Sequence, residues 1–144
     1  AKCKLEQEKI IINNKKKMKF KFYIMRITGF YNKKDPYSVI SKFYKISKKN
    51  QIVWHSSGNE LRDYIHVDDL SKIIVKFVKF NYKVGIYNIV SGKSQKLKNI
   101  FFKILKNLKI KKNIKFYPNK KEFNMRFDNS KLIKVIGNFK FLSI

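Results

Sequence analysis

Several residue types are scarce in this 144-residue chain, and each scarcity excludes a class of protein. Cys3 is the only cysteine, so an internal disulfide is impossible and a reducing, cytoplasmic compartment is expected. No apolar run approaches the roughly 20 residues that a membrane-spanning helix needs, so we expect no membrane association. The first residues lack the charge, apolar block and small-residue cleavage site of a signal peptide. Because the chain has no initiating Met, we expect a processed, trimmed or partial polypeptide.

Acidic residues are also scarce, with 9 Asp and Glu against 35 Lys and Arg, which gives a formal net charge of +26. Such a charge suggests a polyanionic partner. However, only 3 of the basic residues are Arg, whose planar guanidinium suits base recognition and phosphate clamping. Lys, Ile, Asn and Phe make up 79 of the 144 residues, and all four have A/T-rich codons. We therefore attribute the charge to genomic bias and do not expect a nucleic-acid partner.

The hydrophobic pattern predicts helices and strands that alternate around a single core. Hydrophobic residues make up 44% of the chain, enough for a folded domain despite the charge. Apolar spacings of three and four predict helices, and strict alternation predicts strands. The predicted elements are a helix over 5–17, a strand over 19–27, a helix over 36–47, strands over 52–54 and 62–67, a helix from 68 or 69, a strand over 86–90, a helix over 97–108, a strand over 114–117 and a helix from 128 to 137. This order favours an α/β fold over a basic helical bundle.

Polar residues at the predicted helix starts are expected to act as N-caps, because their side chains can accept the free N–H groups of the first turn. We assign this role to Asp68 or Asp69, to Ser94 and to Asp128. Pro36 is expected to lie in the first turn of its helix, where a missing N–H costs nothing. No linker is long enough to divide the chain into separate domains.

The segment GNELRDYIHVDDL, from Gly58 to Leu70, carries the most specific pattern in the chain. It resembles the Gly-rich turn, Arg-Asp-aromatic-Ile-aromatic-Val-Asp-Asp strand and following helix of the extended short-chain dehydrogenase/reductases that act on nucleotide sugars, the NAD-dependent epimerases and dehydratases. In that family, a Rossmann domain that binds NAD(P) is joined to a small C-terminal lobe that holds a nucleoside-diphosphate sugar. The resemblance implies that Arg62 contacts the substrate's phosphates or ribose, a role suited to a fixed fork of donors. Residues 84–102 resemble the family's Gly-x-x-Tyr-Asn-Ile-x-Ser-Gly strand and turn.

Two further segments match the same family with departures. In FYIMRITGFYNKKDP, from Phe22 to Pro36, the resemblance implies that Thr28 lies near the nicotinamide end of the cofactor. Gly29 stands where many members have a substrate-binding Asn, so the usual sugar contact is expected to be missing. Between residues 116 and 131, Lys121 replaces an Arg that often binds substrate phosphate in the family, which implies a weaker substrate contact.

Other features suggest sites that the sequence does not support. His66 could act as a general base, but alternation places it in a strand and the family does not use its position for chemistry. The run Gly92-Lys93-Ser94 resembles the end of a phosphate-binding loop, but that motif needs four residues between its glycines. We interpret it as a turn between a strand and a helix. No metal site is expected.

The first residues, AKCKLEQEK, resemble the helix that carries the family's Tyr-x-x-x-Lys catalytic motif. A spacing of four places Tyr and Lys on one helical face, where the Lys cation lowers the Tyr pKa and holds the nicotinamide ribose. The resemblance implies that Lys4 is this catalytic and cofactor-binding lysine, with the Tyr immediately before Ala1. The alternatives are Lys2, with a Tyr further upstream, and a Lys4 that is only a solvated helix charge.

The resemblance covers the chain from Ala1 to about Gly137. It implies a single partial domain: residues 1–31 end a Rossmann part, and residues 32–144 form mainly the substrate-binding lobe. The implied cofactor is NAD or NADP, bound mainly outside this chain, because the sequence lacks the Gly-x-x-Gly-x-x-Gly turn for the pyrophosphate. The implied reaction is hydride transfer from a nucleotide sugar to NAD, a keto-sugar intermediate and return of the hydride. We expect no catalysis by the chain alone.

The expected partners are the nucleotide-sugar substrate, a separate N-terminal Rossmann half and, in a full enzyme, a second copy. Two other interpretations remain open. The chain could be a basic protein that binds nucleic acid or an anionic surface, with salt-sensitive affinity. It could also be a decayed or split-gene remnant, whose exposed seam would favour association.

Overall fold

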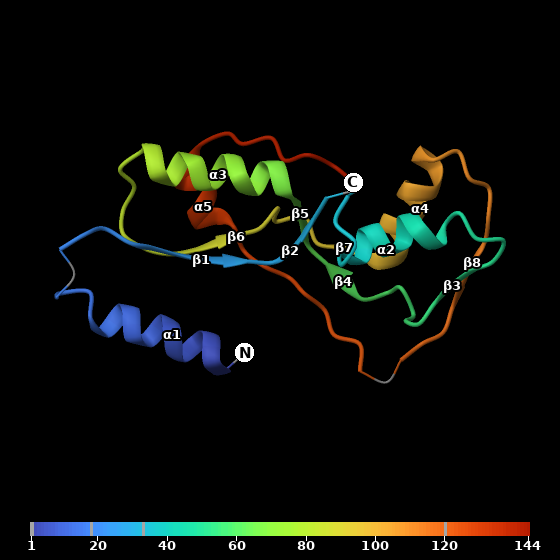
Figure 1. Cartoon of the computed structure of the whole chain (residues 1–144), viewed down its shortest axis with the longest axis horizontal. Helices are drawn as coiled ribbons and strands as arrows, with labels where there is room; N and C mark the ends of the chain where they lie inside the picture. Colours follow the sequence, from blue (N-terminus) through green and yellow to red (C-terminus); the bar gives the residue numbers. More distant parts are fainter. Residues whose placement is uncertain (1, 18, 33, 120) are drawn as a thin grey trace.

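The computed structural model describes residues 2–17, 19–32, 34–119 and 121–144 of the chain. Helices and strands alternate along it, which confirms the predicted α/β class (Figure 1). In chain order the elements are α1 (Lys2–Asn13), β1 (Tyr23–Ile27), β2 (Gly29–Tyr31), α2 (Val39–Ile46), β3 (Ile52–Trp54), β4 (Leu61–Arg62), β5 (Tyr64–His66), α3 (Val67–Lys79), β6 (Gly85–Ile89), β7 (Gln95–Lys96), α4 (Leu97–Asn107), β8 (Ile114–Phe116) and α5 (Ser130–Ile136).

The parallel strands β1 and β6 form the middle layer of one half of the molecule. They pair from Tyr23 opposite Gly85 to Ile27 opposite Ile89. Figure 1 shows α3 and α5 on one side of these strands and α1 on the other. The side chains buried between the strands and α3 and α5 form one apolar core: Ile65, Leu70, Ile73, Phe77, Tyr87, Ile89, Leu132 and Ile136. Strands covered on both faces are typical of parallel sheets.

The other half of the molecule is built around α2 and α4, with β3 paired to β8 in parallel beside them. Phe43 of α2 stacks on Phe101 of α4 with ring centroids 3.8 Å apart. The apolar spacing of α4 predicted its buried face correctly, except that Leu108 lies just past the helix end and is 38% exposed. The buried residues of this second core are Tyr31, Ile40, Phe43, Ile52, Leu97, Ile100, Phe101, Ile104 and Leu105.

Two predicted strands differ from the observed ones because of their pairing partners. The strand predicted over 19–27 is regular only where it pairs with β6, and Phe20 is 69% exposed. The strand predicted over 62–67 is divided at Asp63 into β4, antiparallel to β7, and β5, parallel to β2. Different neighbours on either side of Asp63 therefore override a continuous β pattern.

The starts of α3 and α4 are not capped as predicted. His66 caps α3, because its Nδ1 accepts the backbone N–H of Asp68 at 3.2 Å. Asp68 and Asp69 lie in the first turn instead, where their negative charges interact favourably with the positive end of the helix dipole. Ser94 does not cap α4, because two residues of β7 separate it from the helix and its Oγ donates to the carbonyl of Met125 at 3.0 Å.

The starts of α5 and α2 lie close to the predicted positions. Asp128 accepts the backbone N–H of Ser130 at 2.9 Å and the Ser130 hydroxyl at 2.8 Å. The N-cap position itself belongs to Asn129, one residue later. α2 begins after Ser38, whose side chain accepts a first-turn N–H, so Pro36 lies ahead of the helix and not within it.

Candidate functional site

Arg62 is held in one orientation by its neighbours. Its backbone pairs with Gln95 of β7. One guanidinium nitrogen, Nη1, donates to the carbonyls of Leu61, at 3.0 Å, and Phe123, and the guanidinium carbon lies 5.1 Å from the Phe123 ring centroid. The other terminal nitrogen, Nη2, lies 4.0 Å from a carboxylate oxygen of Glu60, which is 5% exposed. These contacts fix the orientation of the guanidinium, and the two N–H groups of Nη1 are both used by the carbonyls.

Asp63 follows Arg62 directly and lies between β4 and β5. Its buried carboxylate accepts hydrogen bonds from the backbone N–H and hydroxyl of Ser91 and from the N–H of Gly92. Gly92 has a φ of +73°, and a Cβ there would lie 2.7 Å from the amide of Asn129. The turn after β6 therefore requires glycine and is fixed to the Arg62 segment.

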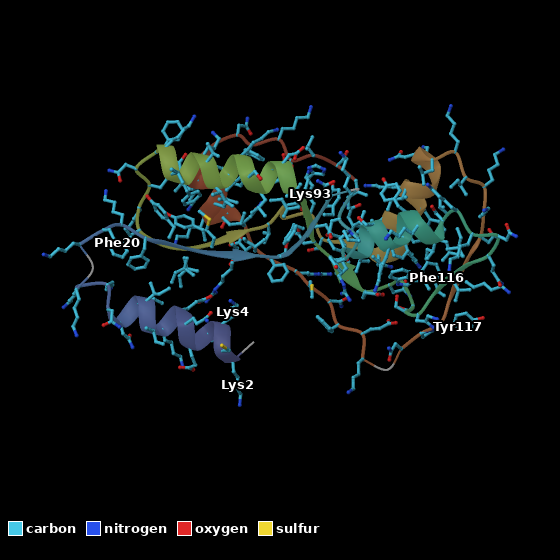
Figure 2. The ribbon with its side chains drawn as sticks, in the orientation of Figure 1. Lys2, Lys4, Phe20, Lys93, Phe116 and Tyr117 are labelled. Carbon is cyan, nitrogen blue, oxygen red and sulfur yellow. The ribbon has the colours of Figure 1, made fainter. Side chains whose placement is uncertain are left out.

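A cavity of about 140 Å³ lies beside Arg62, between β4, β5, the turn after β6, α4 and the C-terminal segment. Burial raises the pKa of Tyr64 to about 12. The described residues that line the cavity include three cations and no carboxylate side chain, which suits an anion. They are Arg62, Tyr64, Ser91, Lys93, Gln95, Ile100, Lys103, Phe141, Leu142, Ser143 and Ile144. Figure 2 shows Lys93 near the middle of the molecule.

Lys121 is exposed and does not line this cavity. Its neighbours fix the segment to the turn before β4: Glu122 accepts the backbone N–H and hydroxyl of Ser57, and Asn124 Oδ1 accepts the N–H of Leu61 at 2.8 Å. The hydrogen bond from the Ser57 hydroxyl lowers the pKa of Glu122 most, and the hydrogen bond from the Ser57 backbone N–H lowers it further. Glu122 was not identified from the sequence, because a lone acid 65 residues from its partner gives no local signal.

Thr28 and Gly29 lie at the junction of β1 and β2. The Thr28 hydroxyl oxygen is buried and has no hydrogen-bond partner among the described residues, so it is available to a bound group. At Gly29 the space for a side chain is already filled, because a Cβ there would lie 2.9 Å from the ring of Tyr64. The structure therefore has no room for the Asn side chain of other family members without movement of Tyr64.

Lys4 is exposed on α1. Four residues later, Glu8 forms a bidentate ion pair with Arg26 of β1, with Nε–Oε1 at 2.9 Å and Nη2–Oε2 at 2.6 Å. Because residues four apart share a helical face, Lys4 lies on the face of α1 that is turned toward β1. Figure 2 shows Lys4 on that side and Lys2 on the opposite side of the helix.

Other candidate sites gain little from the structure. The His66 imidazole caps α3 and packs edge-on against Tyr31, with ring centroids 5.0 Å apart. Among the described residues, no group of three or more His, Cys, Asp or Glu could hold a metal ion. Within the same described ranges, no helix has the length and apolar character needed to cross a membrane.

Comparison with known proteins tests the family that the motifs suggest. The model of the NAD-dependent epimerase/dehydratase family matches residues 1–90, more than half of the chain. The chain belongs to this family. The matched residues include Lys4, Thr28 and the Arg62–Asp63 segment. Among curated proteins, no sequence matches the chain.

Solved epimerases and dehydratases share the fold of this family member. The UDP-N-acetylglucosamine 4-epimerase of Methanobrevibacter ruminantium M1, in complex with UDP-N-acetylmuramic acid, is 22% identical over 96% of this chain and 46% of its own, with a TM-score of 0.79. UDP-glucose 4-epimerase of Thermotoga maritima, with UDP-glucose, is 18% identical over 90% and 44%, with a TM-score of 0.76. The dTDP-glucose 4,6-dehydratase of Bacillus anthracis, with NAD, is 18% identical over 90% and 42%, with a TM-score of 0.72. This chain therefore spans less than half the length of each.

Proposed function

We propose that this chain is the C-terminal, substrate-binding part of an NAD-dependent nucleotide-sugar epimerase or dehydratase, and that it does not catalyse the reaction alone. The main support is the placement of Arg62. Arg62 of the family segment lines a cavity together with two further cations, and Asp63 holds the turn that carries one of them. A nucleoside diphosphate presents the charge that such a cavity favours. The ammonium group of Lys121, at the end of an exposed side chain, would also contact the substrate.

The proposed cofactor is NAD or NADP. Two features fit its nicotinamide end: the buried Thr28 hydroxyl without a partner among the described residues, and Lys4 on the face of α1 that is turned toward β1. When bound, the dinucleotide would accept a hydride from the sugar and return it. The placement of Lys4 favours it over Lys2 as the residue that holds the nicotinamide ribose. The pyrophosphate would bind outside this chain, since a Gly-x-x-Gly-x-x-Gly turn is missing from the sequence.

The proposed partner is a separate N-terminal half that carries the nucleotide-binding strands. β1 pairs with β6 along one edge, and no strand of the described chain pairs with the other edge, although helices cover both faces. Such covered strands are typical of the inside of a parallel sheet. Twofold pairing of β1 with a second copy would be antiparallel, and two copies of charge +26 would repel each other. A parallel strand of a nucleotide-binding half therefore fits this edge best.

Calorimetric titration with UDP-glucose and UDP-N-acetylglucosamine tests the proposed function. We expect saturable binding with a Kd of about 1 mM or tighter, a range typical of enzyme substrates. Arg62→Gln should weaken it strongly, and Arg126→Gln, an exposed arginine outside the cavity, serves as the control. If the chain instead binds single-stranded DNA with a steep salt dependence and shows no preference for nucleotide sugars, the proposal is wrong and the basic-binder alternative gains support.

A further inference from the structure

We propose that Lys93 and Lys103, together with Arg62, bind the diphosphate of the nucleotide sugar. This inference rests on the proposed function and assigns two residues that the family motif does not. All three cations line the same cavity of about 140 Å³. That volume is too small for a whole nucleotide sugar, because ligand pockets for drug-sized molecules measure roughly 300–1,000 Å³. It suits the compact, charged middle of the molecule, with the sugar and the base on either side.

Lys93 is displayed on a turn that is fixed before any ligand binds. Its backbone N–H donates to the Ser91 hydroxyl oxygen at 3.1 Å. The same hydroxyl donates to the buried Asp63 carboxylate at 2.7 Å, and Gly92 donates to the other carboxylate oxygen at 2.9 Å. Because the backbone from Ser91 to the N–H of Lys93 is held in this way, mainly the side chain has to be ordered on binding. A rigid support lowers the entropy cost of recognition.

Lys103 reaches the cavity from the second turn of α4. Its amine donates to the Gln95 amide oxygen at 2.8 Å, across a separation of eight residues. Gln95 is the β7 residue that pairs with Arg62. The hydrogen bond therefore directs the Lys103 amine toward the strand that carries the guanidinium. An ammonium group has three donors, so two remain for an anion.

The side chains of Asp63 and Glu60 lie close to these cations but do not line the cavity. Asp63 already accepts three hydrogen bonds from the turn. Glu60 is paired with Arg62 at 4.0 Å and does not line the cavity. On the opposite wall, apolar side chains limit access of water and strengthen the attraction between opposite charges. These are Ile100, Phe141, Leu142 and Ile144.

Lys93 and Lys103 would also compensate for the replacement, at position 121, of the family's phosphate-binding Arg by Lys. The resemblance places a phosphate-binding residue at Lys121, but its side chain is exposed and lies outside the cavity. Lys93 and Lys103 provide the positive charge inside the cavity instead. The substrate's diphosphate would thus be held by α4 and the turn after β6, and not by the segment that carries Lys121.

Titrations of the full chain with UDP, UMP and uridine test this assignment. We expect Lys93→Gln and Lys103→Gln each to weaken UDP binding about fivefold, as for the loss of one partly exposed charge-assisted contact. The double variant should lose at least about 20-fold if the contacts are independent. Uridine, which has no phosphate, should bind all variants equally. Lys106→Gln, one turn further along α4, exposed and outside the cavity, is the matched control and should change UDP binding less than about twofold.

The outcomes separate this inference from the proposed function. If Arg62→Gln abolishes UDP binding while the lysine variants bind normally, the assignment of Lys93 and Lys103 is wrong and the proposed function stands. If Lys106→Gln weakens binding as much as the cavity variants, the effect is one of net charge, and the assignment is also wrong. If the unaltered chain binds neither UDP nor a UDP-sugar, both proposals fail. Thermal melts of each variant identify any loss of binding that is caused by unfolding.

Discussion

Asp63 Oδ1 accepts two hydrogen bonds from Ser91, one from its hydroxyl at 2.7 Å and one from its backbone N–H at 3.1 Å. The two residues are 28 positions apart, and both are buried. They connect the strand segment that carries Arg62 to the turn that carries Lys93. The geometry of the proposed anion site therefore depends on one carboxylate that does not itself line the cavity.

Asp63→Ala is expected to lower the free energy of unfolding by about 3 kcal/mol, because hydrogen bonds to a buried charged group are lost and donors are left without partners. Asp63→Asn should cost less, since one amide oxygen can still accept from Ser91. Urea unfolding followed by circular dichroism measures both changes. Asp68→Ala, at an exposed carboxylate in the first turn of α3, is the control and should cost less than about 1 kcal/mol. Equal stability of Asp63→Ala and the unaltered chain would show that the turn is not held by this carboxylate.

Arg26→Gln is expected to release α1 from β1. The ion pair between Arg26 and Glu8 links the two elements, and no residue of α1 is buried. The hydrogen bond from Arg26 lowers the pKa of Glu8 below its ordinary value of 4.5. The link should therefore be complete above pH 4.5 and be lost as the pH falls through the lowered pKa. Hydrogen exchange of residues 2–13 should quicken in the variant at pH 7. Lys9→Gln, which removes only an exposed pair with Glu6, should not produce this change.

Tyr64→Phe is expected to remove one of the tyrosines that lose their phenolic proton only at high pH. Burial raises the pKa of Tyr64 to about 12, and burial together with the nearby Asp69 carboxylate raises that of Tyr31 to about 12 as well. Folding therefore opposes ionisation of these phenols. Their contribution to stability should be complete below pH 10 and be lost as the pH rises toward 12. Absorbance at 295 nm follows the titration, and Tyr37→Phe, at a ring that is 88% exposed, should leave the late phase unchanged.

The sequence predicted the elements whose signal is local. The apolar spacing of α4 identified its buried face, and three residues of β3 were predicted with the observed bounds, Ile52–Trp54. The break at Asp63 could not be predicted, because it depends on which strands pair on either side of it. The capping role of His66 was missed for a related reason. A continuous strand through Val67 left no helix start at His66 for an imidazole to cap.

The candidate site was predictable only where a family motif marks it. Arg62 was identified from its segment, and the structure places it in the cationic cavity. Lys93 and Lys103 gave no signal, because lysine is the commonest residue type of the chain and nothing local separates a cavity lysine from a solvated one. The assignments of Lys4, Thr28, Arg62 and Lys121 stay predictions until ligands are titrated, as does the division of the domain at residue 31.

Gly29→Asn restores the residue that many family members have, yet it is expected to destabilise this chain. A Cβ at Gly29 would lie 2.9 Å from Cε1 and 3.0 Å from Cδ1 of the Tyr64 ring, and Tyr64 packs against the second core. Forcing extra atoms into such a space typically costs about 1–3 kcal/mol. We expect urea unfolding to show a loss in this range and UDP-glucose binding to gain nothing.

Combining Gly29→Asn with changes at Tyr64 separates two effects at Tyr64: steric crowding by its ring and the loss of its hydroxyl group. Tyr64→Phe keeps the ring, so it should leave the clash unrelieved, whereas Tyr64→Ala should make room for the introduced amide side chain and recover part of its cost. A double-mutant cycle between positions 29 and 64 measures this coupling, which should exceed about 0.5 kcal/mol for residues in contact. Additive effects would mean that the ring moves aside freely. The family's Asn would then be compatible with this lobe, and its absence would not be explained by packing.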